Sequence, residues 1–129
     1  MNVHKEQAAS LIAAGSRDAL TLQLLNETGL APHESIGFHA QQACEKFIKA
    51  RLVLNGVFFE RTHDLVVLHK LATQHQISIP ADIETLRALN SYAVQFRYEG
   101  CAIELVASDE CVAITASLAS WVDAAYEIA

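Results

Sequence analysis

Several side chains in the stretch FHAQQACEKFIKARL, residues 38–52, could bind a phosphate within an otherwise apolar, helix-forming sequence. At 100° per residue, one sector beside the apolar stripe of this predicted helix holds what we call the polar strip: His39, Gln42, Lys46 and Lys49. Two positive charges on one strip suit the phosphate of a nucleotide or RNA. The alternative is a solvated face, in which Glu45 and Lys49, four residues apart, form a surface pair worth about 0.3 kcal/mol.

A second set of candidates lies further along the chain: His63, Asp64, Arg97 and Tyr98. Cleavage of RNA needs a group that exchanges protons near neutral pH, such as His63, and a cation such as Arg97 to stabilise the charged phosphorane. Tyr98 could stack on a base. The alternatives are structural: His63 fixes the loop before the next helix, and Arg97 and Tyr98 pack at a helix end.

Metal and cofactor chemistry is not expected. His63, His69 and His75 recur every six residues, but on one helix neighbouring members of this series point about 120° apart and do not converge on one ion. The glycines stand singly, without a P-loop or dinucleotide-binding motif. The three cysteines are odd in number and form no CxxC pair, so we interpret them as reduced core thiols.

The elements that position these side chains are predicted to be helices, because no segment alternates with period two for long enough to form a strand. The sequence predicts one all-α domain, residues 1–129, with about five helices in an up-down bundle. Their expected positions are about Val3 to Glu27, Ser35 to Leu54, a helix capped by Thr62, one from about Pro80 into FRYEG, and one capped by Ser108. Asn55 and Gly56 suit a left-handed cap at the end of the second helix.

Two of these helices are apolar on two faces. In the second helix, Phe38, Ile48 and Leu52 lie opposite the main stripe, and the last helix repeats the pattern. Such a helix is either central in the fold or shared with another subunit, because a monomer has little reason to expose a second apolar face. We therefore expect a homodimer or higher assembly.

Composition narrows the class of protein. The net charge is −6, which excludes a wholly basic nucleic-acid-binding surface, so that any contact with RNA would be local. Hydrophobic residues make up 52% of the chain, which argues for a folded domain. The first residues, MNVHKEQAAS, lack the apolar segment of a signal peptide, and no run approaches a membrane span, so we predict a cytoplasmic location.

Three segments together resemble the HEPN domain family: FHAQQACEKFIKARLVLNG, then THDLVVLHKLA, then FRYEG. The resemblance implies an all-α bundle that commonly dimerises and often works with a minimal nucleotidyltransferase as a toxin–antitoxin-like pair. Many members are metal-independent ribonucleases with an Arg and a His four to six residues apart. This chain departs from that pattern, because YEGCAIELV follows Arg97 without a histidine.

Three hypotheses follow from the residues and the resemblance. The first is a homodimeric nucleotide- or RNA-binding module with a nucleotidyltransferase partner. The second is an endoribonuclease toxin with a degenerate site made of Arg97 and a histidine from elsewhere. The third is a structural helical partner without chemistry of its own.

Overall fold

A computed structural model describes residues 3–93 and 105–129. Within these ranges the regular elements are α-helices and there is no strand, which confirms the all-α prediction. The helices are α1 (Val3–Thr28), α2 (His33–Leu54), α3 (Leu65–Gln74), α4 (Ile83–Asn90) and α5 (Ser108–Glu127). No helix in the described ranges is both long and apolar enough to cross a lipid bilayer.

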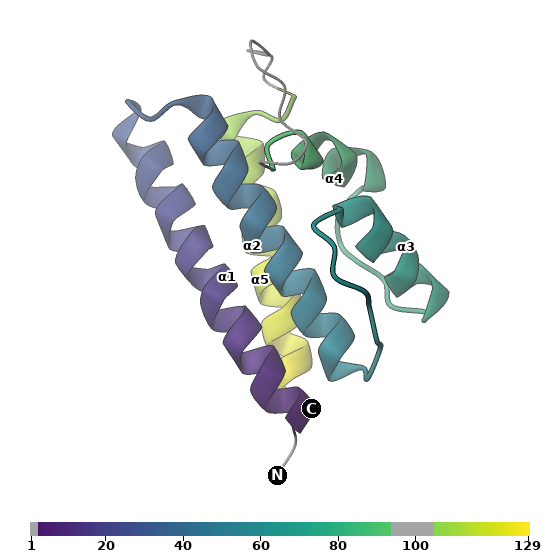
Figure 1. Ribbon diagram of the computed structural model, residues 1–129. Helices are drawn as coiled ribbons and strands as arrows, with labels where there is room; N and C mark the ends of the chain where they lie inside the picture. The colour runs from purple at the N-terminus through teal and green to yellow at the C-terminus, as the bar shows by residue number, and fades with distance from the viewer. Residues whose placement is uncertain (1–2, 94–104) are drawn as a thin grey trace.

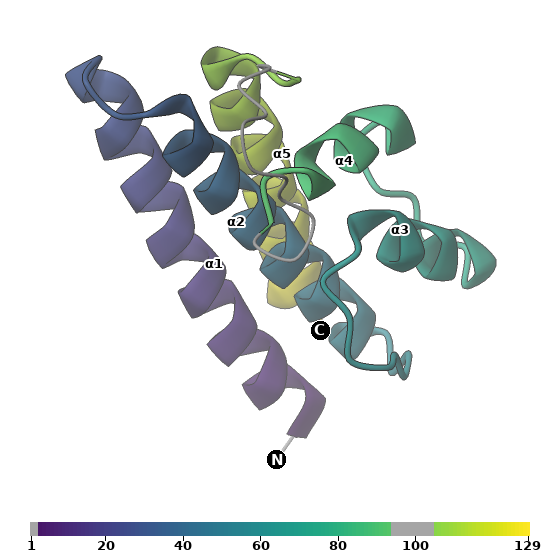
Figure 2. The ribbon, with the colours of Figure 1, turned by 45° about the horizontal axis from the view of Figure 1, so that its top comes forward.

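The three long helices pack side by side, and the short α3 and α4 cover α2 on the side away from α1 (Figures 1 and 2). Helix α1 runs antiparallel to α2, and α5 runs in the same direction as α2, so both chain ends lie at one end of the bundle (Figure 1). The Nζ atom of Lys5 accordingly donates to the backbone oxygen of Ala129 at 3.1 Å.

Helix α2 is the centre of the fold, because it packs against each of the other four helices. Ile48 and Leu52, from its second apolar face, are fully buried, as is Phe47 on its main stripe. A helix that is apolar on two faces was expected to be either central in the fold or shared with another subunit, and α2 is central. The second apolar face is therefore covered within one chain and does not by itself require another subunit.

The turn after α2 has the predicted left-handed cap. Gly56 has a φ of +69°, a conformation that favours glycine. The amide of Val57 donates to the oxygen of Leu52 at 2.9 Å, and the amide of Gly56 donates to the oxygen of Val53 at 3.0 Å. This pair of bonds is a Schellman motif, which stops the helix and turns the chain toward α3.

The N-cap predicted for the third helix was wrong. Asp64, not Thr62, caps α3: its Oδ1 accepts from the amides of Val66 at 2.9 Å and Val67 at 3.4 Å. Thr62 acts just before the helix, where its Oγ1 accepts from the amide of Asp64 at 3.1 Å. A carboxylate at this position also complements the positive end of the helix dipole.

Three other predicted helix starts are corrected. Helix α2 begins at His33 rather than Ser35, and α4 begins at Ile83, after Pro80. In α5, Ala107 is the N-cap and Ser108 is the first helical residue. Ser108 instead has its Oγ 3.0 Å from Nδ1 of His33, in a bond that joins the starts of α5 and α2.

Helix α4 ends at Asn90, where the backbone tightens into bonds of the i→i−3 type through Tyr92 and Ala93. The predicted continuation into FRYEG falls on residues 94–104, outside the described ranges. Tyr92 is buried, and its hydroxyl accepts from the amides of Leu105 at 3.1 Å and Val106 at 3.3 Å. This residue therefore fixes the segment before α5 against the end of α4.

Candidate functional site

A buried carboxylate on α2 is the centre of the candidate site. Glu45 is only 4% exposed, although a glutamate is rarely buried without partners. Its Oε2 lies 3.0 Å from Nζ of Lys49, and its two oxygens each lie 3.1 Å from Nδ1 of His63. The amide of Gln41 donates to Oε1 at 3.3 Å. We call these four side chains the Glu45 cluster.

Gln41 joins this cluster to the loop before α3. It is fully buried, and its Nε2 donates to the backbone oxygen of His63 at 2.9 Å. Its Oε1 accepts from Nε2 of Gln42 at 2.7 Å. His63 is thus held through both its ring and its carbonyl group. This supports the structural hypothesis that His63 fixes the loop, without removing a chemical role for the ring.

The ring of His63 has one nitrogen committed and one open. Because a carboxylate only accepts hydrogen bonds, Nδ1 carries the proton that faces Glu45. The side chain is 43% exposed, and its Nε2 has no partner among residues 3–93 and 105–129. A carboxylate that fixes the tautomer and orientation of a histidine is the arrangement that general acid–base sites use.

Asp64, predicted as a ligand-binding residue, has its Oδ1 engaged within the chain. Besides the two α3 amides, this oxygen accepts from Nδ2 of Asn90 at 2.8 Å. Oδ1 of Asn90 in turn accepts from the amide of Leu65 at 3.0 Å. The carboxylate therefore occupies the start of α3, where a phosphate would otherwise bind.

A second carboxylate cluster joins α1 to α2. Oδ1 of Asp18 lies 3.0 Å from Nδ1 of His39, and Oδ2 contacts Nζ of Lys46. The exposed fractions of the Asp18, His39 and Lys46 side chains are 14%, 27% and 27%. We call these three side chains the Asp18 cluster.

The polar strip is therefore not an open row of positive charge. Lys46 is paired with Asp18 and Lys49 with Glu45, and the carboxylates offset both lysine charges. The surface-pair alternative is also wrong for Glu45 and Lys49, because only 5% and 13% of their side chains are exposed. All four strip residues are tied into the two clusters, His39 and Lys46 through Asp18, Gln42 and Lys49 through Gln41 and Glu45.

Arg97 and Tyr98, the remaining predicted site residues, lie outside the described residues. Cations without a side-chain partner in the described ranges are found instead beside α3. Arg61 and Lys70 line a groove of about 590 Å³ between the loop after α2 and α3, together with Phe58, whose side chain is 83% exposed. Lys70 also lines a second hollow of about 470 Å³ that faces Arg87 on α4.

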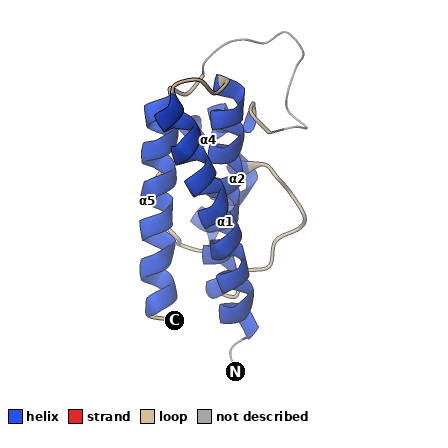
Figure 3. Ribbon diagram, turned by 90° about the vertical axis from the view of Figure 1, so that its left-hand side faces the viewer, coloured by secondary structure: helices blue, strands red, loops and turns tan. Residues whose placement is uncertain are grey.

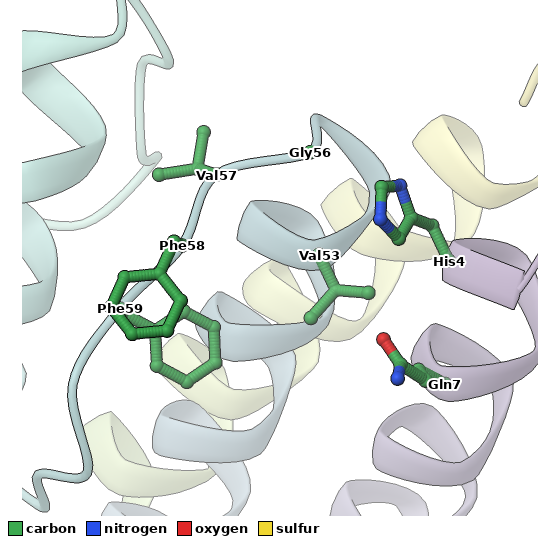
Figure 4. A pocket seen from close by; sticks show the side chains of 7 residues that line it. All are labelled: His4, Gln7, Val53, Gly56, Val57, Phe58 and Phe59. Atoms are coloured by element: carbon green, nitrogen blue, oxygen red, sulfur yellow. The ribbon is translucent and has the colours of Figure 1, made fainter.

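The two phenylalanines of the loop separate this groove from another hollow. Phe58 and Phe59 also line a space of about 280 Å³ that reaches His4 and Gln7 at the start of α1 (Figure 4). An exposed aromatic ring between two hollows, with cations at the rim of the larger one, offers both stacking and phosphate contacts.

Glu45 and Asp18 were not among the site residues predicted from the sequence. For Glu45 a signal was present, because Gln41 and Glu45 fall on the same sector of α2 as Ile48 and Leu52. A polar pair on an apolar face indicates a buried hydrogen-bond network. For Asp18 no comparable signal exists, because its partners depend on the register between α1 and α2.

The cysteines in the described ranges, Cys44 and Cys111, are fully buried, which agrees with core thiols, while Cys101 lies outside those ranges. Burial raises the pKa of the Cys44 thiol to about 12, and the hydrogen bond from its contact with Thr115 offsets only part of this effect. Such a thiol is not a nucleophile at neutral pH. No three His, Cys, Asp or Glu side chains in the described ranges are grouped so as to hold a metal ion.

Two comparisons place the chain among known proteins. The family model of the HEPN domain matches residues 8–125. The crystal structure of an archaeal HEPN homologue superposes with a TM-score of 0.63 at 21% sequence identity, over 93% of this chain and 98% of that one. At this identity the structural likeness shows the fold alone. No curated protein sequence matches the chain.

Proposed function

This chain belongs to the HEPN domain family, and from that premise we propose that it is a homodimeric nucleotide- or RNA-binding module. In this proposal it acts as the partner of a minimal nucleotidyltransferase, in a toxin–antitoxin-like pair. The partner protein and the pairing rest on what the family resemblance implies. The binding role is supported by the surroundings of His63 and by the groove beside α3.

The observation that carries the binding proposal is the oriented, half-exposed ring of His63 next to the groove beside α3. Arg61 and Thr62, which immediately precede His63, line that groove. The groove adds the cations Arg61 and Lys70 and the exposed ring of Phe58. Single-stranded nucleic acid binds through cations that contact phosphates and aromatic rings on which bases stack. Glu60 also lines the groove, so Arg61 and Lys70 leave it with one net positive charge, a small local basic site on a chain with net charge −6.

The test is equilibrium binding of a fluorescein-labelled single-stranded RNA to the full chain over a series of salt concentrations. The double variant Arg61→Ala with Lys70→Ala should weaken binding, and the slope of log K against log salt should fall by about 1.4, or about 0.7 for each phosphate interaction that the variant removes. Arg51→Gln is the control, because Arg51 lies over the ring of Trp121 on α5, 5.0 Å away, and does not line the groove. Equal slopes for all three proteins would exclude the groove as the binding site.

An endoribonuclease is the second candidate function, and the pair formed by Glu45 and His63 favours it. Nε2 of a carboxylate-held histidine can take a proton from a ribose 2′-hydroxyl or give one to the leaving oxygen. Cleavage of a labelled RNA in the presence of EDTA should then be lost in His63→Gln and in Arg97→Ala, with helical content unchanged. Binding without cleavage in the unmodified protein would leave the first proposal standing and exclude this one.

The nucleotidyltransferase partner is tested separately, by co-expression with a minimal nucleotidyltransferase encoded next to this chain and co-purification. A stable complex together with RNA binding supports the full proposal. A complex from a chain that binds neither RNA nor nucleotides supports the third hypothesis, in which the protein is a structural partner.

A further inference from the structure

Helix α1 forms the outer edge of the bundle and presents one long face away from α2 and α5 (Figures 1 and 3). This face includes two leucines one turn apart, Leu20 at 57% and Leu24 at 53% exposed. Arg17 and Glu27, both exposed, flank them on the same stripe. The four positions follow the 3-4-3 spacing of a helix seam that packs against another helix.

The charged side chains of this stripe, Arg17 and Glu27, can still form ion pairs with another molecule. The guanidinium of Arg17 has no side-chain partner among residues 3–93 and 105–129. The carboxylate of Glu27 accepts one weak bond in those ranges, from Nε2 of Gln23 at 3.3 Å. Two exposed leucines between such a cation and an available anion make an amphipathic stripe that the described part of the chain leaves uncovered.

The stripe is complementary to itself in one direction. Its centre is residue 22, with Leu20 and Leu24 each two residues away, and Arg17 and Glu27 each five residues away. In a second, antiparallel copy of α1, Leu20 therefore faces the partner's Leu24, and Arg17 faces the partner's Glu27. A two-fold axis at residue 22 makes each of these contacts twice.

The other orientation is unfavourable. In a parallel pair with the same register, Arg17 would face the partner's Arg17, and Glu27 the partner's Glu27, and like charges at such positions are destabilising.

We propose that two copies of this chain associate through an antiparallel pairing of α1 centred on residue 22, with leucines in the middle and an Arg17–Glu27 ion pair at each end. This inference rests on the homodimer of the proposed function and names its surface. It names a different surface from the sequence-based argument for assembly, whose α2 face is buried within the chain.

The first experiment measures the self-association constant of the full chain by sedimentation equilibrium. Arg17→Glu and Glu27→Arg should each weaken association by about tenfold, because each variant places two like charges together at both ends of the pair. The double variant Arg17→Glu with Glu27→Arg should restore most of the lost affinity, because the charges are opposite again. Asp123→Arg, a charge reversal at an exposed position of α5, is the control and should associate as the unmodified protein does.

The second experiment tests the register by oxidative cross-linking in a Cys101→Ser background. A mixture of Leu20→Cys and Leu24→Cys chains should form more disulfide-linked dimer than either chain alone, because position 20 faces position 24 of the partner. Equal or greater linkage in the single-variant samples would contradict the antiparallel register. Unchanged circular dichroism spectra show that these surface variants fold.

The outcomes distinguish failure of the proposed α1 pairing from failure of the homodimer itself. A dimer that neither charge reversal affects overturns the α1 pairing and leaves the homodimer in place. A chain that remains monomeric at the highest concentrations overturns both. Weakening by the single reversals with recovery in the double variant supports both.

Discussion

The Glu45 and Asp18 clusters contain the same three functional groups and differ in what surrounds them. In each, a carboxylate binds Nδ1 of a histidine and Nζ of a lysine. The Glu45 cluster has a carboxylate 5% exposed and a histidine 43% exposed, whereas the corresponding values in the Asp18 cluster are 14% and 27%. The carboxylate is thus more buried and the ring more accessible at Glu45, which suits an oriented group that meets a ligand.

The elements that the two clusters join also differ. Asp18 comes from α1, and both of its partners come from α2, so this cluster braces two long helices. Glu45 and Lys49 both come from α2, and His63 comes from the loop before α3. The Glu45 cluster therefore positions a loop residue next to a groove, and its integrity should affect both stability and ligand binding.

The largest expected effect is on stability, from removal of the more buried carboxylate. Glu45→Gln leaves the Lys49 ammonium, 13% exposed, without its counter-ion, which should lower the free energy of unfolding by about 3 kcal/mol. Asp18→Asn leaves a more exposed lysine and should cost about 1 kcal/mol. Urea unfolding monitored by circular dichroism measures both values, and equal losses would contradict the difference between the clusters.

Thiol reactivity gives an independent measure of the same difference. With the pKa of Cys44 raised to about 12, its thiolate is scarce in the folded protein at pH 8, so alkylation proceeds through opened molecules. In a Cys101→Ser background, a loss of about 3 kcal/mol should raise the iodoacetamide labelling rate of the buried thiols roughly hundredfold in Glu45→Gln. Asp18→Asn should raise it about fivefold. Rapid labelling before either substitution would contradict the buried state of the thiols.

A second substitution that removes the unpaired lysine should distinguish the two clusters further. Adding Lys49→Met to Glu45→Gln removes the uncompensated charge, and the double variant should recover about 2 kcal/mol of the lost stability. The corresponding pair in the other cluster, Asp18→Asn with Lys46→Met, should recover less than about 1 kcal/mol, because Lys46 is partly hydrated. No recovery in the first pair would mean that Glu45 acts through its hydrogen bonds to His63 and Gln41 rather than through charge.

The smallest expected effect on stability comes from substitution of His39, the histidine of the Asp18 cluster. His39→Gln keeps a hydrogen-bonding side chain near Asp18, and Lys46 remains to neutralise the carboxylate, so the loss should stay below about 1 kcal/mol. Thermal unfolding checks this value. A loss as large as that of Glu45→Gln would show that the Asp18 cluster depends on its histidine rather than on its lysine.

Sequence reasoning found what depends on local periodicity and turn chemistry. It identified the all-α class, the stripe of α2 and the cap at Gly56, because each is encoded within a few neighbouring residues. It misplaced the cap of α3, since Thr62 and Asp64 are both good N-cap residues and their spacing alone does not decide between them.

The Glu45 and Asp18 clusters could not be predicted from such local sequence patterns. His63 lies 18 residues from Glu45, and Asp18 lies 28 residues from Lys46, so both pairs depend on how separate elements pack. The default expectation that charged residues face water also pointed to a solvated strip. Only the coincidence of Gln41 and Glu45 with the second apolar face of α2 indicated a buried polar network.

The most direct test of the account compares His63→Gln with His39→Gln in binding of single-stranded RNA at low salt. Both substitutions remove an imidazole that a carboxylate holds, so they differ in which cluster loses its ring. We expect His63→Gln to weaken RNA binding by about fivefold or more and His39→Gln to leave it unchanged, in line with the loss of the one hydrogen bond that Nε2 of His63 can accept from a ribose hydroxyl. Equal affinities for the two variants would contradict the assignment of the binding role to the Glu45 cluster and its neighbouring groove.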